Sequence, residues 1–219
     1  MPTYAELQTR VRYRTGNRST LTSGDGLTIL QSSINDAQRE LAHTFWFHEC
    51  EDSLTVTATI NQYYIELGAF TNIYAILSCY DTTNSVFIDP FRGGIERFER
   101  TFSTVSGTPS QWLHHSDRLL LTPTPSAAIS YRLNIYTEIP DMTTGNSPVI
   151  PLTFHKAIEH LAVRNVWNAL GDEERAMAAD KDYNNYLRRV RPPKAFEAYT
   201  SKRRGVVPLT SFRNRRLGV

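Results

Sequence analysis

The stretch SGTPSQWLHHSDRLLLTPTPSAAISYRLNIY, residues 106 to 136, is the part of the chain whose pattern most clearly predicts one structure. Leu119, Leu120 and Leu121 form an apolar run between two groups of turn residues. Apolar and polar residues then alternate from 129 to 135, as they do in a strand with one buried face. We therefore predict two strands of a sheet here, bounded by prolines that cannot donate to a ladder.

The segments upstream of this stretch continue the β pattern. Residues 54–60 and 63–67 alternate in the same way, and Asn61-Gln62 lies between them, which predicts a hairpin. Shorter β-prone runs follow at residues 73–80 and 85–88. An amphipathic segment, residues 95–102, predicts one short helix beside the sheet.

The two ends of the chain show helical patterns instead. Thr3 and Glu6 have the spacing of a capping box, which predicts a helix that ends near Gly16. Apolar residues then recur at steps of three and four from 27 to 45, and again from 154 to 170 after Pro151. A last helix is expected up to residue 191, where two prolines end it.

These patterns predict an α+β fold: a helical bundle with helices from both ends of the chain, an inserted antiparallel β module and an extended C-terminal arm. The expected segments are 1–50 for the N-terminal helices, 51–148 for the β module with its short helix, 149–191 for the C-terminal helix pair, and 192–219 for the arm.

Length and composition are those of a globular protein, with 219 residues, 40% hydrophobic and 21% charged. The two cysteines lie 29 positions apart without a ligand or redox motif, so we expect reduced thiols. No window approaches the roughly 20 apolar residues that span a bilayer, and the first residues lack the pattern of a secretory signal. A soluble intracellular product without membrane contact is expected.

The sequence favours neither catalysis nor metal binding. His155 and His160 are five positions apart and fall on different helix faces, whereas the zinc-protease motif needs a step of four. His114 and His115 are adjacent on a predicted strand, so their rings point to opposite faces. The chain also lacks a phosphate-binding loop and a nucleophile elbow. We expect no catalytic residue, no metal, no cofactor and no enzymatic activity.

The arm, residues 192–219, is strongly basic. It carries seven basic residues and one acidic residue, with an apolar β-prone run between two basic clusters. One interpretation is a disordered, solvated tail. A second is binding of nucleic acid, in which the basic clusters neutralise phosphates and aromatic residues stack on bases. A third is a partner-binding arm that adds a strand to a neighbouring sheet edge while its charges meet an acidic rim.

The order of these parts resembles the head-to-tail adaptor (connector) proteins of tailed bacteriophages, over roughly residues 27 to 190. The residues that carry the likeness are Gly107, Pro109 and Trp112, then Leu121, Pro123 and Pro125, and finally Tyr136. Trp112 stands where the family leads us to expect a tyrosine-like residue.

The resemblance implies a structural virion protein of the phage neck, assembled in the host cytoplasm and without enzymatic activity. It would form a homo-oligomeric, dodecameric ring that joins the portal protein to a tail nozzle or tail tube protein and conducts genomic DNA through its lumen. The arm would bind the portal through Lys202, Arg203, Arg204, Val206, Val207, Leu209, Phe212, Arg213, Arg215 and Arg216. A nucleic-acid-binding accessory protein, a tail nozzle and another head-completion protein remain alternatives.

Overall fold

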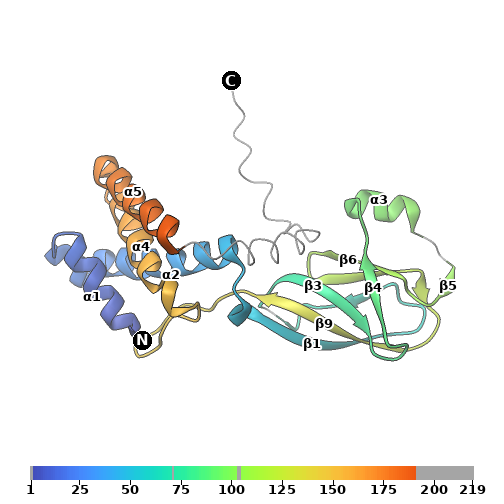
Figure 1. Cartoon of the computed structure of the whole chain (residues 1–219). Coiled ribbons are helices and arrows are strands. Elements are labelled where there is room, and N and C mark those ends of the chain that lie inside the picture. Colours follow the sequence, from blue (N-terminus) through green and yellow to red (C-terminus); the bar gives the residue numbers. More distant parts are fainter. Residues whose placement is uncertain (1, 71, 103–104, 191–219) are drawn as a thin grey trace, which may run out of the picture. The chain divides into compact units, whose positions relative to one another are not determined.

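The computed structural model describes residues 2–70, 72–102 and 105–190 of the 219-residue chain. Five α-helices and a large β-sheet lie in these ranges, which confirms the α+β class (Figure 1). The described residues divide into two compact units. Residues 2–50 and 139–190 form the helical unit, and residues 51–138 form the β unit.

The helical unit contains four α-helices and three short 3-10 helices within its described residues. The α-helices are α1 (Tyr4–Arg14), α2 (Gly24–Phe45), α4 (His155–Ala169) and α5 (Glu173–Val190). The 3-10 helices are η1 (Ser19–Thr22), η2 (His48–Cys50) and η3 (Leu152–Phe154). Helix α4 contacts α1, α2 and α5, so its apolar residues lie at the centre of the unit.

Local sequence signals account for several of the helix ends. The Thr3 hydroxyl accepts from the Glu6 amide at 3.3 Å, and the Glu6 carboxylate accepts from the Thr3 amide at 3.1 Å. This is the predicted capping box, which satisfies two amides that the first turn of a helix leaves unpaired. Helix α2 begins at Gly24, three residues before the apolar repeat predicted from Leu27. The turn at Gly171 separates α4 from α5 and has a positive φ of 73°.

The β unit is built on a sheet of seven strands in the order β1-β9-β3-β4-β6-β7-β2. Their bounds are β1 Glu51–Ala58, β2 Tyr64–Glu66, β3 Ile73–Asp81, β4 Val86–Pro90, β6 Gln111–His115, β7 Arg118–Thr122 and β9 Ile129–Thr137. The short strands β5 (Ser106–Gly107) and β8 (Thr124–Pro125) pair separately. One core contains side chains from β1, β9 and β3 together with side chains from β6 and β7.

Helix α3 (Gly94–Thr101) connects β4 to β6, and these two strands are parallel. Parallel neighbours require a crossover connection, which α3 supplies. The ring of Phe98 anchors this helix, since it lies 5.2 Å from the ring of Phe91 and 5.7 Å from that of Phe102. The β module is therefore mainly antiparallel, but not entirely so as we predicted, because β4–β6 and β5–β8 are parallel pairs.

Two predictions within the β unit are wrong. Residues 54–67 do not form a hairpin, because β1 pairs with β9 and β2 pairs with β7. The stretch 106–136 contains more than two strands, because residues 111–115 form β6, which pairs with β7. Local alternation identifies a strand without specifying its partner, and both strand pairings depend on residues distant in sequence. The predicted division into four segments remains a prediction.

Candidate functional site

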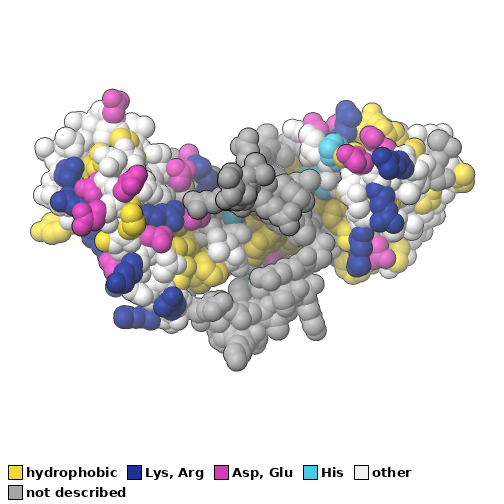
Figure 2. Space-filling model, turned by 90° about the horizontal axis from the view of Figure 1, so that it is seen from above, with side chains coloured by type: hydrophobic (Ala, Val, Ile, Leu, Met, Phe, Trp, Pro, Cys, Tyr) yellow, Lys and Arg dark blue, Asp and Glu magenta, His cyan; other side chains and the backbone are white. Residues whose placement is uncertain are grey.

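The ten residues predicted to bind the portal, between 202 and 216, lie outside the described residues. The candidate site within the described residues is a set of polar and aromatic contacts on helices α1, α2, α4 and α5 of the helical unit. Side chains of both signs are interleaved on this unit, as the face in Figure 2 shows.

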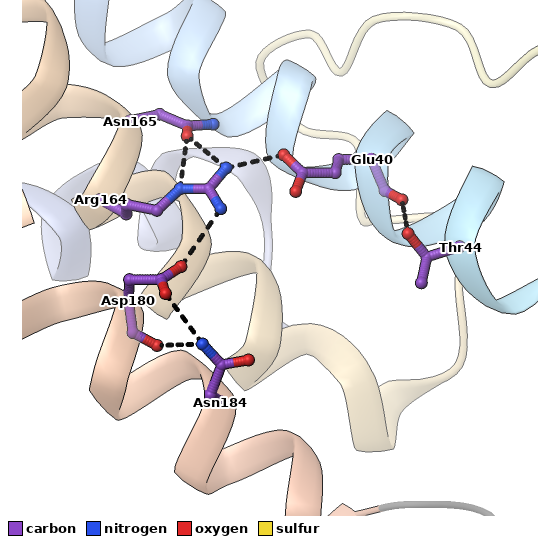
Figure 3. A network of polar contacts seen from close by, with 6 residues as sticks. All are labelled: Glu40, Thr44, Arg164, Asn165, Asp180 and Asn184. Atoms are coloured by element: carbon purple, nitrogen blue, oxygen red, sulfur yellow. Dashed lines mark hydrogen bonds and ion pairs between the residues drawn. The ribbon is translucent and has the colours of Figure 1, made fainter. Parts of the chain in front are cut away.

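Arg164 of α4 is the centre of a polar network that joins three helices (Figure 3). Its guanidinium group donates to Glu40 of α2 at 2.8 Å and to Asp180 of α5 at 3.3 Å. It also donates to the Asn165 side chain at 3.0 Å and 3.2 Å. Asn184 in turn donates to the Asp180 carboxylate at 2.9 Å. The planar guanidinium group thus holds one orientation and fixes α4 between α2 and α5.

A cleft of about 450 Å³ lies between α1, α4 and α5. Charged and aromatic side chains line it, together with small residues of α5. Arg14 contributes one wall and pairs with Glu159 at 3.2 Å and with Asp182 at 3.7 Å. The lining of the cleft therefore combines apolar side chains, such as Val163 and Ala179, with the ion-paired Arg14 and Asp182.

Trp167 forms the aromatic part of this cleft. Its ring is almost buried, and the guanidinium groups of Arg18 and Arg175 each lie 4.8 Å from its centre. Both distances are within the range of a cation–π interaction. Arg18 precedes η1 and Arg175 lies on α5, so one indole ring links the segment after α1 to the C-terminal helices.

His160 is the histidine that lines the cleft. Its ring stacks on Tyr186 with centroids 5.6 Å apart, and its Nδ1 atom is buried without a hydrogen-bond partner. Burial lowers the pKa of His160, and the nearby Arg14 lowers it further. Tyr186 is held by a 2.8 Å hydrogen bond from its hydroxyl to the carbonyl of Thr153. His160 is thus a neutral packing residue at neutral pH.

The other groups singled out in the sequence also have structural roles. His155 donates from Nε2 to the carbonyl of Ile150 at 2.8 Å. Cys50 and Cys79 are both buried, and neither forms a disulfide within the described residues. Within the described ranges, no three His, Cys, Asp or Glu residues are grouped as a metal ion would require. No helix of those ranges is long and apolar enough to cross a membrane.

Sequence reasoning missed the cleft and the network. Arg18, Glu40 and Arg175 carry no local signal, because nothing in the spacing of single arginines and glutamates reveals their partners in space. The helical period of residues 154–170 predicted that Val166 and its apolar neighbours are buried, and the structure confirms this. The same helical period does not indicate that the ring of Trp167 contacts two arginines.

The β unit, residues 51–138, is thus inserted in the sequence between the two parts of a helical unit, residues 2–50 and 139–190, which ion pairs and aromatic contacts hold together. The family model of the SU10 adaptor proteins matches residues 2–208. The chain belongs to the SU10 adaptor protein family. A comparison with curated proteins finds no match.

Family membership confirms the resemblance seen in the sequence. The chain is a structural adaptor of a bacteriophage and a component of the virion. The family implies association with portal and tail components, and it implies a non-enzymatic role.

Proposed function

We propose that the chain is a head-to-tail adaptor that assembles into a dodecameric ring between the portal and the tail. The ring joins these two components in the neck of the virion and conducts genomic DNA through its lumen. The match to the adaptor family over residues 2–208 is the observation that carries this proposal. Assembly of the particle in the host cytoplasm is part of the same proposal.

The helical unit suits the role of a rigid body in such a ring. The Arg164 network connects α2, α4 and α5, and the contacts of Arg18 and Arg175 with the Trp167 ring connect the segment between α1 and η1 with α4 and α5. A rigid unit limits the conformational entropy lost when copies associate. We propose that these helices act as one bundle and that the segments 1–50 and 149–191 form one domain with 51–148 inserted.

The arm is the proposed portal-binding element. Its basic clusters and the apolar run between them combine the two interactions that an extended segment uses to bind a partner: main-chain pairing with apolar contacts, and charge complementarity at the rim. The residues proposed to act are Lys202, Arg203, Arg204, Val206, Val207, Leu209, Phe212, Arg213, Arg215 and Arg216.

Truncation after Pro193 tests the arm. The shortened chain should retain its circular dichroism spectrum and unfolding temperature but no longer bind the purified portal in a sedimentation or light-scattering assay. The matched control is the full chain with Arg188 and Arg189 replaced by alanine, since these exposed residues lie just before the arm. The control should bind normally. Unchanged portal binding by the truncated chain would refute a portal-binding arm.

The basic arm also favours one alternative, a nucleic-acid-binding accessory protein. That function predicts that DNA affinity falls steeply with salt, by about one log unit per log unit of salt for each phosphate contacted. A ring around DNA could also bind it weakly and non-specifically. Two measurements distinguish the adaptor from the nucleic-acid-binding accessory protein. They are portal binding and DNA binding, each followed for the same set of arm variants at several salt concentrations.

A further inference from the structure

Helix α5 carries a stripe of exposed side chains on the side that faces away from the core of the helical unit. Glu174, Met177 and Lys181 follow one another at steps of three and four, which place residues on one face of a helix. All three are exposed. The buried residues of the helix lie on its other side and are Ala176, Ala179 and Tyr183.

Met177 is the apolar centre of this stripe. It is 68% exposed, and the neighbouring Ala178 is exposed as well. Methionine is flexible and polarisable, so it adapts to the surface of a partner. A small residue beside it allows another helix to approach closely. A single exposed apolar residue is common on protein surfaces, so the charges on either side of Met177 decide what this stripe can bind.

The charges of the stripe differ from the other charges around α5. Three nearby carboxylates are paired within the unit: Asp172 with Arg175, Asp180 with Arg164, and Asp182 with Arg14. Glu174 and Lys181 have no ion pair in the part of the chain that the structure describes.

Glu174 and Lys181 are also too far apart along the helix to neutralise each other. Side chains pair along a helix at three or four positions, whereas these two are seven positions, or roughly 10 Å, apart. The residues three and four positions after Glu174 are the apolar Met177 and Ala178. The stripe therefore presents one negative and one positive group on either side of an apolar centre.

Such an arrangement is complementary to itself when two helices run antiparallel. Glu174 lies three positions before Met177, and Lys181 lies four positions after it. A two-fold axis near Met177 thus brings Glu174 of each copy beside Lys181 of the other, with the two methionines between them. A parallel arrangement would instead place like charges opposite each other. The charges therefore favour the antiparallel orientation, as charged positions do in coiled coils.

We propose that the stripe of Glu174, Met177 and Lys181 is a contact between two copies of the free chain, in which the α5 helices pack antiparallel. A two-fold contact uses the same patch on both copies and closes after two. It is thus distinct from the contact that repeats around the proposed ring, and it does not rest on the proposed function. The contact covers about two helical turns, which is at the low end of interface sizes, so the dimer should dissociate on dilution.

Analytical ultracentrifugation of the full chain tests the dimer. Over a concentration series in low salt, the measured mass should rise from that of one copy to that of two. Added salt should shift the equilibrium toward the monomer, because it screens exposed ion pairs. A chain that stays monomeric throughout the series would overturn the proposal.

Exchange of the two charges tests the antiparallel register. Glu174→Lys and Lys181→Glu each place like charges opposite each other and should raise the dimer Kd at least about tenfold, or 1.4 kcal/mol. The variant with both substitutions exchanges the two charges and should recover the dimer. Arg10→Glu is the matched control, since it changes the net charge as Lys181→Glu does, at an exposed position of α1. This control should keep the dimer.

The contrary results are equally specific. Association that neither single substitution weakens would assign it to another surface, and a double variant that stays monomeric would exclude the antiparallel register; either result overturns the proposal. Met177→Glu is a second, independent variant that places two carboxylates near the two-fold axis and should abolish the dimer. Circular dichroism verifies that each variant is folded.

Portal binding separates this inference from the proposed function. A dimer that responds to the charge exchange, in a chain that does not bind the portal, would refute only the proposed function. A monomeric chain that binds the portal would overturn only the α5 contact.

Discussion

Arg18 and Trp167 lie 149 positions apart in the chain, yet the guanidinium group of Arg18 lies 4.8 Å from the centre of the Trp167 ring. Arg175 lies at the same distance from that ring. The indole ring thereby connects the segment before η1 with α4 and α5.

Trp167→Ala should destabilise the helical unit by about 3–5 kcal/mol, because it removes a nearly buried aromatic side chain and leaves a cavity. Arg18→Ala should cost only about 0.5–1 kcal/mol, the range of one cation–π interaction at an accessible site. Urea unfolding followed by the helical circular dichroism signal measures both. Equal losses in the two variants would contradict a dominant role for burial of the indole.

Arg164→Ala should lower the free energy of unfolding by about 1 kcal/mol. Its carboxylate partners are partly exposed, with side chains 44% accessible in each case, so water screens the ion pairs. The loss should shrink as salt is added, because screening weakens the same pairs in the unmodified protein. Arg188→Ala is the control, since Arg188 is exposed and has no ion pair in the part of the chain that the structure describes. A loss that does not change with salt would indicate packing as the cause.

Stability should fall as the pH is lowered below about 6.5, the ordinary pKa of histidine. Burial lowers the pKa of His160 and of His155 in the folded protein. Below the ordinary value the unfolded state therefore binds more protons, and protonation favours unfolding. The stability contributed by the neutral rings is fully present above that pH and declines toward the folded pKa. His160→Gln should flatten this dependence, whereas His115→Gln, at an exposed position, should not.

Thermal melts between pH 5 and pH 8 test this prediction. The relevant readout is the difference in unfolding temperature between the ends of the range for each variant. A His160→Gln protein with the pH dependence of the unmodified chain would show that other groups control it.

Cys79 should resist thiol reagents in the folded state. Burial raises the pKa of its thiol to about 12, and the Asp81 carboxylate contributes to the rise. The reactive thiolate is thus nearly absent at pH 8. A Cys50→Ser variant isolates this thiol, which should react with a chromogenic disulfide only after unfolding in guanidinium. Rapid reaction of the native variant would show that the β unit opens.

Local structure was the most predictable part of this protein. The capping box at Thr3 and the apolar repeat of α2 were readable because caps and helical periods depend on residues within one or two turns of each other. The strand pattern of β9 was readable for the same reason, since alternation requires only that one face is buried. The contacts of the candidate site were not predictable. Glu40, Arg164 and Asp180 meet because three helices pack, and no local pattern encodes that packing.

The sequence by itself determined the α+β class, the positions of most helices and strands, the basic character of the arm and the adaptor resemblance that the family match confirms. Only the tertiary structure decided strand pairing. Residues 106–136 supply β6, β7 and β9. The sequence predicted that Val56 belongs to a hairpin with residues 63–67, but β9 places Tyr131 opposite Val56 instead. The physical reason is that a strand's own residues fix which face is buried, whereas its neighbours are chosen by how the whole core packs. That choice places β1 at the end of the strand order, where β9 is its ladder partner within the described chain.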